Sequence, residues 1–217
     1  MLAASAIEII GGTPLIALDR IYTGPGRIIA KAEFLLPGGS VKDRAAKAIL
    51  LAAREDGRLK PGMPVVEMTS GNMGAGLAVA CAALGHPLVV TMSAGNSPAR
   101  AKMLEGLGAE VVLIAQVDGS PGQVTGSDVN AAAQAACAIA RARDGFYVDQ
   151  FNAAEGIAAH EAVVTAPDGA RREKCAATAR AARFVPSRTA GTRRNAAKLV
   201  GERARLGTFR AILSNCE

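Results

Sequence analysis

The sequence is poor in aromatic residues: they make up 3% of its 217 residues, and tryptophan is absent. Half of the residues are nonetheless hydrophobic, so a core must be built mainly from alanine, valine, leucine and isoleucine. Such small side chains suit close contacts between helices and a sheet, and this composition favours an α/β domain. The length suffices for one large domain or two small ones.

Several functional classes lack their signatures here. The four cysteines lie far apart, and none forms a Cys-x-x-Cys pair or stands at zinc-ligand spacing from a histidine, so we expect reduced thiols and no metal site. No apolar run approaches the roughly 18 residues of a membrane helix. The N-terminus lacks the basic start and long apolar stretch of a signal peptide. These absences predict a cytoplasmic protein with no membrane partner.

The net charge of +6 is unevenly distributed. Residues 1–160 contain 13 Lys/Arg and 14 Asp/Glu, a net of −1, and residues 161–217 contain 12 and 5, a net of +7. A basic tail can bind polyanions, but Phe184 and Phe209 are the only aromatic residues available there for stacking on bases. A nucleic-acid partner is therefore not expected.

Short apolar runs alternate with helix-like segments in the first three quarters of the chain. The expected strands span 65–68, 88–92, 111–114 and 146–148, and the expected helices span 41–55, 74–84, 98–107 and 128–143. An extended segment is expected over residues 13–35. Apolar strands that alternate with helices are typical of a parallel sheet. The predicted fold class is α/β, a parallel sheet with helices on both faces.

Residues 161–217 do not continue this pattern. They contain 13 alanines and 10 arginines in 57 residues. Only weak patterns remain there, for a helix over 195–205 and a strand over 208–213. We treat this part as a basic, Ala/Arg-rich tail for which no fold is predicted.

Lys42 has the surroundings that most favour chemistry. It follows the turn signal Pro37-Gly38-Gly39, and Ser40 stands at the position of a helix N-cap. Lysines usually avoid the positive end of a helix, where the field favours the neutral amine that Schiff-base chemistry needs. The alternative is a solvated surface charge, which is the role of most lysines.

Residues 69–74, Thr-Ser-Gly-Asn-Met-Gly, follow an expected strand and open an expected helix. Ligands bind at this end of the strands in a parallel sheet. The amides and hydroxyls of such a loop favour an anion, either a carboxylate or a phosphate. The alternative is an ordinary strand–helix turn capped by Thr69 and Ser70.

Three motifs occur in a fixed order along the chain. They are Gly11-Gly12-Thr13-Pro14-Leu15, Pro37-Gly38-Gly39-Ser40-Val41-Lys42-Asp43-Arg44 and Thr69-Ser70-Gly71-Asn72. Together they resemble the cysteine synthase and cystathionine β-synthase family of pyridoxal-phosphate enzymes. Gln150-Phe151-Asn152 and His160 continue the similarity, which covers residues 7–160. The resemblance implies the tryptophan synthase β-like fold (fold type II) and pyridoxal 5'-phosphate as cofactor.

The resemblance also implies roles for individual residues. Lys42 corresponds to the catalytic lysine that binds the cofactor as a Schiff base and later moves the α-proton. Asn72 corresponds to the residue that hydrogen-bonds the ring hydroxyl of the cofactor. The groups that correspond to those holding the substrate carboxylate are Thr69, Ser70, Gly71, Met73 and Gln150. No catalytic role is assigned to His160.

The implied reaction is β-replacement on an activated serine, in which O-acetylserine and sulfide give cysteine. The substrate would be a small amino acid. The resemblance implies a small movable domain over residues 36–145 and a larger domain that combines residues 1–35 with 146–160. Family members are commonly dimers, so a homodimer is a further expectation.

The chain departs from the family at three places. Leu36 stands where the family usually has asparagine, and Met73 where it usually has threonine, which removes a hydroxyl from the carboxylate loop. No Gly-Thr-Gly-Gly-Thr-like run for the cofactor phosphate is found, and Gly191-Thr192 is a poor match. The large domain is therefore predicted to be truncated. The tail is then either a basic extension or an out-of-frame reading after about residue 161, and the alternative function is an inactive relative that acts at most as a binding module.

Overall fold

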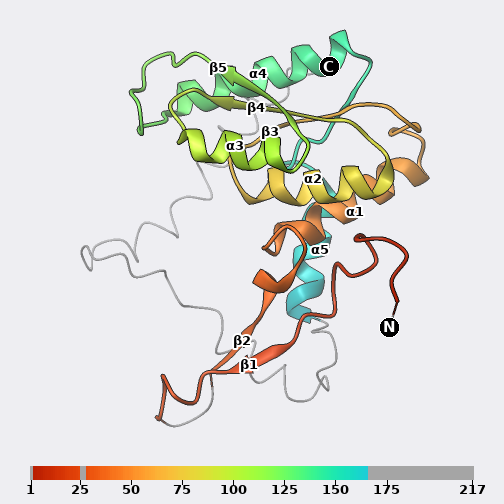
Figure 1. Ribbon diagram of the computed structural model, residues 1–217, viewed down its shortest axis with the longest axis vertical. Coiled ribbons are helices and arrows are strands. Elements are labelled where there is room, and N and C mark those ends of the chain that lie inside the picture. The colour runs from red at the N-terminus through yellow and green to blue at the C-terminus, as the bar shows by residue number, and fades with distance from the viewer. Residues whose placement is uncertain (1, 25–27, 166–217) are drawn as a thin grey trace. The chain divides into compact units, whose positions relative to one another are not determined.

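The computed structural model describes residues 2–24 and 28–165, and Figure 1 shows their arrangement. A four-stranded sheet has the strand order β5-β4-β3-β6. Its strands are β3 (Val65–Met68), β4 (Leu88–Ser93), β5 (Glu110–Ile114) and β6 (Phe146–Tyr147). Every pair of neighbouring strands is parallel. The predicted parallel α/β sheet is thus confirmed.

Helices lie on both faces of this sheet. The helices of the described residues are α1 (Lys42–Glu55), α2 (Asn72–Leu84), α3 (Pro98–Gly106), α4 (Gly126–Ala142) and α5 (Ala154–Thr165). Helix α4 contacts all four strands on one face, while α2 and α3 lie on the other face (Figure 1). Helix α1 packs against α2, and α5 packs against α1. On the α2 side of the sheet, α2 is therefore covered by α1, and α1 is covered by α5.

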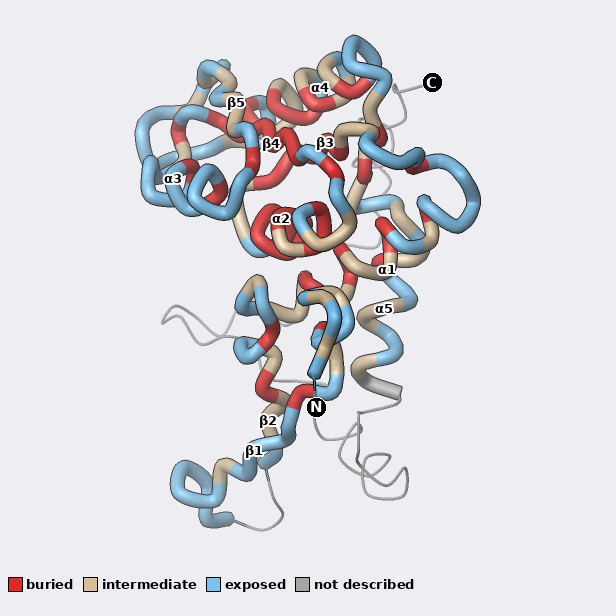
Figure 2. The backbone as a smooth tube through the Cα atoms, turned by 45° about the vertical axis from the view of Figure 1, so that its right-hand side comes forward, coloured by how far each residue is buried: buried red, intermediate tan, exposed pale blue. Residues whose placement is uncertain are grey.

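The core is centred on β3, β4 and α2. Every residue of β3 and β4 is buried, and Figure 2 shows α2 as largely buried. Small residues allow α1 and α2 to approach closely: a Cβ atom built on Gly76 would lie 3.0 Å from the Cα atom of Asp43. Glycine at position 76 therefore sets the distance between the two helices whose N-termini carry the candidate site residues.

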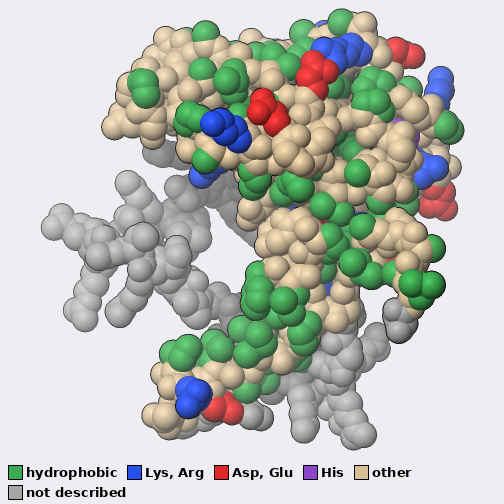
Figure 3. Space-filling model, viewed as in Figure 1, with side chains coloured by type: hydrophobic (Ala, Val, Ile, Leu, Met, Phe, Trp, Pro, Cys, Tyr) green, Lys and Arg blue, Asp and Glu red, His purple; other side chains and the backbone are tan. Residues whose placement is uncertain are grey.

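The N-terminal part forms a separate antiparallel pair. Strands β1 (Leu15–Ala17) and β2 (Ile29–Lys31) pair with each other and are followed by the 3-10 helix η1 (Glu33–Leu35). The extended segment predicted over residues 13–35 thus contains a reversal of the chain. Large apolar side chains remain exposed here, namely Leu15, Ile16, Ile21, Ile28, Ile29, Phe34 and Leu35. Figure 3 shows hydrophobic side chains gathered over this part.

Three helices differ from their expectation: α2 and α4 each begin two residues early, and α5 was not predicted. Helix α4 begins at Gly126, two residues early, because Thr125 and Asp128 form a capping box. In it, the Asp128 backbone N–H donates to Thr125 Oγ1 at 3.2 Å, and the Thr125 N–H donates to Asp128 Oδ2 at 3.0 Å. Helix α5 has no counterpart in the expectation, since its apolar residues do not gather on one face of the helix. Packing against α1 stabilises α5 as a helix, although its own sequence pattern does not predict one.

Some expectations remain open. The helix over 195–205, the strand over 208–213 and the tail from residue 166 lie outside the described residues. The described residues belong to one compact unit, and the division into a domain over 36–145 and another around it stays a prediction. Within the described part, no helix combines the length and the apolar character needed to cross a membrane.

Cys81 is the cysteine for which the described residues test the expectation of reduced thiols. It is a free and buried thiol, as expected. Cys175 and Cys216 lie outside the described residues.

Candidate active site

The turn before α1 fixes the position of Lys42. The Gly39 N–H donates to the Leu36 carbonyl at 2.8 Å, and Gly39 has a φ of +78°, which a glycine adopts without strain. Ser40 Oγ accepts from the Lys42 N–H at 3.2 Å, so the Ser40 side chain caps the helix as the sequence predicted. Val41 lies between Ser40 and Lys42, the first residue of α1. Lys42 is therefore held in the first turn of α1.

Asp43 closes this turn from inside. Its side chain is fully buried, and its Oδ2 accepts from the Gly38 N–H at 2.5 Å. Burial raises the pKa of this carboxyl above its usual value, although the hydrogen bond from Gly38 opposes the shift. Asp43 thus ties the Pro-Gly-Gly turn to the helix that carries Lys42.

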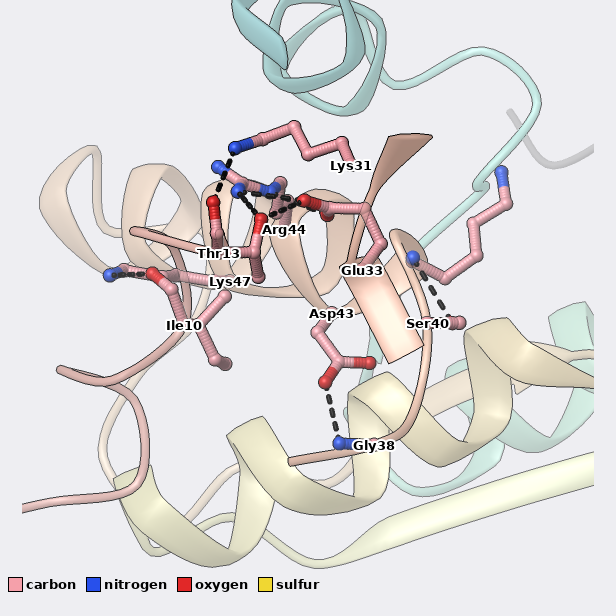
Figure 4. A network of polar contacts seen from close by, with 10 residues as sticks. Ile10, Thr13, Lys31, Glu33, Gly38, Ser40, Asp43, Arg44 and Lys47 are labelled. Atoms are coloured by element: carbon pink, nitrogen blue, oxygen red, sulfur yellow. Dashed lines mark hydrogen bonds and ion pairs between the residues drawn. The ribbon is translucent and has the colours of Figure 1, made fainter. Parts of the chain in front are cut away.

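A polar network ties the N-terminal part to α1 (Figure 4). Arg44 donates to both carboxylate oxygens of Glu33, at 2.7 and 2.9 Å, and to Thr13 Oγ1 at 3.2 Å. Lys31 Nζ donates to the Thr13 carbonyl at 2.9 Å. Burial raises the pKa of Glu33, but the hydrogen bonds from Arg44 and Thr13 outweigh it and hold the pKa below its usual value. This two-point pairing of Arg44 fixes the rotation of α1.

The loop after β3 opens α2 beside α1. The Gly71 N–H donates to Thr69 Oγ1 at 3.3 Å, and the Gly74 N–H donates to the Gly71 carbonyl at 2.9 Å. No heavy atom lies within 4 Å of a Cβ built on Gly71, so the space next to it is open. Asn72 is the first residue of α2, about one helical turn before Gly76, which lies against the Lys42–Asp43 backbone. The two helix N-termini therefore lie close together.

Two residues change what the loop offers to a ligand. The Met73 side chain is buried in the hydrophobic core, so a contact of Met73 with a substrate would have to come from its backbone. Arg100, in the first turn of α3, donates from Nη1 to the Ser70 carbonyl at 3.4 Å. Arg100 has no counterpart among the residues selected from the sequence, because it lies 30 positions from Ser70.

Gln150 lies at the carboxyl end of β3, next to this loop. Its Nε2 donates to the Met68 carbonyl at 3.1 Å and to Glu67 Oε1 at 3.2 Å. Its backbone N–H donates to Glu67 Oε2 at 3.3 Å. The structure thus brings Gln150 to the strand that leads into Thr69, and it adds Glu67, which the sequence analysis did not select.

His160 approaches Lys42 from α5. Its Nε2 lies 3.4 Å from Lys42 Nζ. Burial, and to a lesser extent the charge of Lys42, lower the pKa of His160, so its ring is mostly neutral at pH 7 and Nε2 can accept a hydrogen bond from the amine. No catalytic role was assigned to His160, because α5 was not predicted. Only the contact of α5 with α1 places it here.

The site consists of amines, amides, hydroxyls and carboxyls. In the described part of the chain, no group of three or more His, Cys, Asp or Glu side chains could hold a metal ion. The convergent features are a primary amine, two adjacent helix N-termini and a loop with hydroxyl groups. Helix N-termini bind anions, and an amine beside them can react with a carbonyl group.

Comparison with known proteins connects this geometry to a family. Residues 7–198 match the family described as "Pyridoxal-phosphate dependent enzyme". A probable cysteine synthase of Bacillus subtilis (strain 168) is 40% identical over 124 residues, which cover 57% of this chain and 40% of that protein. Cysteine synthase 1 of Emericella nidulans is 52% identical over 105 residues, which cover 48% of this chain and 28% of that protein. The chain therefore matches well under half the length of these relatives.

Solved structures agree with the sequence comparison. The crystal structure of O-ureido-L-serine synthase is 34% identical with a TM-score of 0.65, over 74% of this chain and 48% of that one. O-acetyl serine sulfhydrylase isoform 3 from Entamoeba histolytica is 32% identical with a TM-score of 0.63, over 74% of this chain and 47% of that one. The shared part thus amounts to about half of each solved chain.

Proposed function

We propose that this chain, which belongs to the family of pyridoxal-phosphate dependent enzymes, carries a site for β-replacement on an activated serine, as in cysteine synthase. The predicted tryptophan synthase β-like fold is confirmed over the matched part. The observation that carries the proposal is the position of Lys42, in the first turn of α1 and against the first turns of α2. O-acetylserine and sulfide are the proposed substrates.

The described residues fit the ring side of pyridoxal phosphate. The group has an aldehyde for an amine, and Lys42 provides one at a helix N-terminus. It also has a ring hydroxyl, for which Asn72 provides an amide in the first turn of α2. The space beside Gly71 is open at the start of α2. When bound, the group supplies an electron sink for the α-carbon of an amino acid.

Lys42 and His160 are the residues proposed for the transfer of the α-proton of the substrate. Lys42 Nζ would hold the cofactor through its amine and, once that amine is free, would accept the proton that leaves the α-carbon of the substrate. Neutral His160 accepts a hydrogen bond from Lys42 Nζ, at the 3.4 Å separation seen here. This contact limits the directions in which the amine can point. A fixed amine is the geometric requirement for proton transfer at one carbon atom.

The loop after β3 would hold the substrate carboxylate. The hydroxyls of Thr69 and Ser70 and the backbone at Gly71 lie at the positive end of α2, where an anion is stabilised. Gln150 would contribute its side-chain amide. These groups select an α-amino acid because they recognise the carboxylate that every such substrate carries. A homodimer and a cytoplasmic location stay predictions of the family resemblance.

Visible absorption tests the proposal. The full chain with pyridoxal phosphate should gain a visible absorption band, because Lys42 would provide the amine that reacts with the aldehyde of the group. Lys42→Ala should lose this band, whereas Lys47→Ala should keep it, since Lys47 lies on the same helix but donates to the Ile10 carbonyl. O-acetylserine should shift the wild-type band to longer wavelength.

Two results would contradict the proposal. One is a colourless wild-type chain in excess cofactor, which would support the alternative of an inactive relative. The other is equal loss of the band in Lys42→Ala and Lys47→Ala, which would show that the amine of Lys42 has no special role.

A further inference from the structure

Glu67 is a buried acid at the edge of the candidate site. It lies in the middle of β3, between the strands β4 and β6, and its exposed fraction is 0%. Carboxyl groups are almost never fully buried unless they are paired. A buried carboxyl group at this position therefore needs a partner, and none of its recorded hydrogen-bond partners carries a positive charge.

Its partner is Gln150. Both oxygens of Glu67 accept from this residue, one from the side-chain amide at 3.2 Å and one from the backbone N–H at 3.3 Å. The amide of Gln150 has two hydrogens, and the second one goes to the Met68 carbonyl at 3.1 Å. Both amide hydrogens of Gln150 are therefore engaged within the chain.

This arrangement conflicts with direct binding of a carboxylate by Gln150. A carboxylate only accepts hydrogen bonds, so Gln150 must withdraw an amide hydrogen from Glu67 or from Met68 before it can bind one. The Met68 carbonyl belongs to the backbone of β3 and cannot change its charge. Glu67 is the partner whose hydrogen bond to Gln150 can change in strength, because its carboxyl group can be protonated or ionised.

We propose that Glu67 is a positioning residue that competes with the substrate carboxylate for the side-chain amide of Gln150. This inference rests on the proposed function, because it takes Gln150 as a ligand of the substrate. Ionised Glu67 holds the amide and adds a negative charge next to the loop. Protonated Glu67 holds it less strongly and releases it to the substrate.

The surroundings of Glu67 place its titration in an accessible range. Burial raises the pKa of Glu67 to about 8, against the hydrogen bonds from Gln150, and Asp149 raises it further. On the neighbouring strand β6, burial raises the pKa of the Tyr147 phenol, and the charges of Glu67 and Asp149 raise it further. The charged residues of α4, which packs on β3, are Asp128 and Arg141, in its first and last turns, and α2 contributes no charged residue.

The sign of the effect follows from this pKa. Below about pH 8 the acid is mostly protonated, and the amide of Gln150 is free to turn. Above it the acid is ionised, and carboxylate binding should weaken. Glu67→Gln mimics the protonated state at every pH, since an amide can accept only one of the two hydrogen bonds and must release the other.

The test measures two properties of the full chain. The side-chain amide of Gln150 is followed by NMR, with its signal assigned by its absence in Gln150→Leu. The affinity for L-serine is measured by calorimetry on the chain loaded with pyridoxal phosphate, with L-serinamide as the ligand that lacks a carboxylate. Thr91→Val is the control, because Thr91 is a buried residue of the neighbouring strand whose hydroxyl donates to the Ala132 carbonyl at 2.7 Å.

We expect the Gln150 amide signal to shift with pH around 8 in the wild type and in Thr91→Val, and to stay constant in Glu67→Gln. Glu67→Gln and the wild type should bind L-serine equally near pH 6.5, and the variant about fivefold more tightly near pH 9.5. The ratio for L-serinamide should stay near one at both pH values. Titration of the ligand amine cancels in these ratios.

Three outcomes would overturn the inference. If Glu67→Gln binds L-serine no more tightly than the wild type near pH 9.5, Glu67 only supports the fold. The same ratio for L-serinamide would show that no carboxylate competes. If none of the variants binds L-serine, the proposed function fails as well, whereas the first two outcomes leave it intact.

Discussion

The sheet and the N-terminal strand pair contain similar apolar residues, but these residues are buried in the sheet and not in the strand pair. All ten residues of β3 and β4 are buried, whereas none of the six residues of β1 and β2 is buried. The sheet is covered by α4 on one face and by α2 and α3 on the other. A pair of strands with three residues each has too little surface to build a core of its own.

This difference explains where the site residues lie. Lys42, Asn72 and Gln150 stand at ends of elements that pack on the sheet or on one another, so the covered region fixes their positions. The polar contacts of Arg44 with Glu33 and Thr13 link the N-terminal part to α1. A rigid layer is therefore separated from a region whose apolar side chains face outward.

Truncation of one leucine in each region should give the largest contrast. Leu77 on α2 is fully buried, and Leu15 on β1 is 37% exposed. Leu77→Ala should lower the free energy of unfolding by about 2–5 kcal/mol, because it leaves a cavity. Leu15→Ala should change it by about 0.5 kcal/mol or less. Urea denaturation measures both, and equal losses would mean that β1 is as well packed as the sheet.

Glycine at the helix contact should have an intermediate effect. A Cβ on Gly76 would lie 3.0 Å from the Asp43 N atom and 3.1 Å from the Lys42 carbonyl carbon. Gly76→Ala should therefore cost about 1–3 kcal/mol and displace the start of α1. The visible absorption band of the chain loaded with pyridoxal phosphate should weaken as α1 is displaced.

Gly106→Ala is the matched control for this change. Gly106 ends α3, and a Cβ there meets no heavy atom within 4 Å. This substitution should be neutral or stabilise the chain by up to about 1 kcal/mol, since alanine favours the helix. If both variants behave alike, the contact between α1 and α2 does not constrain Lys42.

A substitution in the exposed region should have the smallest effect on stability. Phe34 in η1 is 65% exposed. Phe34→Glu should change the free energy of unfolding by about 0.5 kcal/mol or less, and it should reduce self-association, because exposed apolar patches promote aggregation. Light scattering over a concentration series measures this, with Phe34→Leu as the apolar control. A large loss of stability would show that η1 belongs to the core.

Much of the fold could be predicted from local patterns. Both ends of each strand of the sheet and of helices α1 to α4 were predicted to within two residues, because apolar runs and turn residues mark them along the chain. The turn at Pro37–Gly39 and the loop from Thr69 were also evident, since each needs specific residues at consecutive positions. The pairing of β1 with β2 was not, because the extended pattern gives no register.

The sequence by itself determined which chemistry this protein could carry: an amine at a helix N-terminus, a hydroxyl-rich loop after a buried strand and the order of motifs that leads to the family. These features are local, so adjacent residues define them. Only the tertiary structure decided that His160 meets Lys42 across 118 positions and that Gln150 meets Glu67 across 83. Such contacts depend on how α5 packs on α1 and how β6 pairs with β3, and no pattern within one segment specifies them.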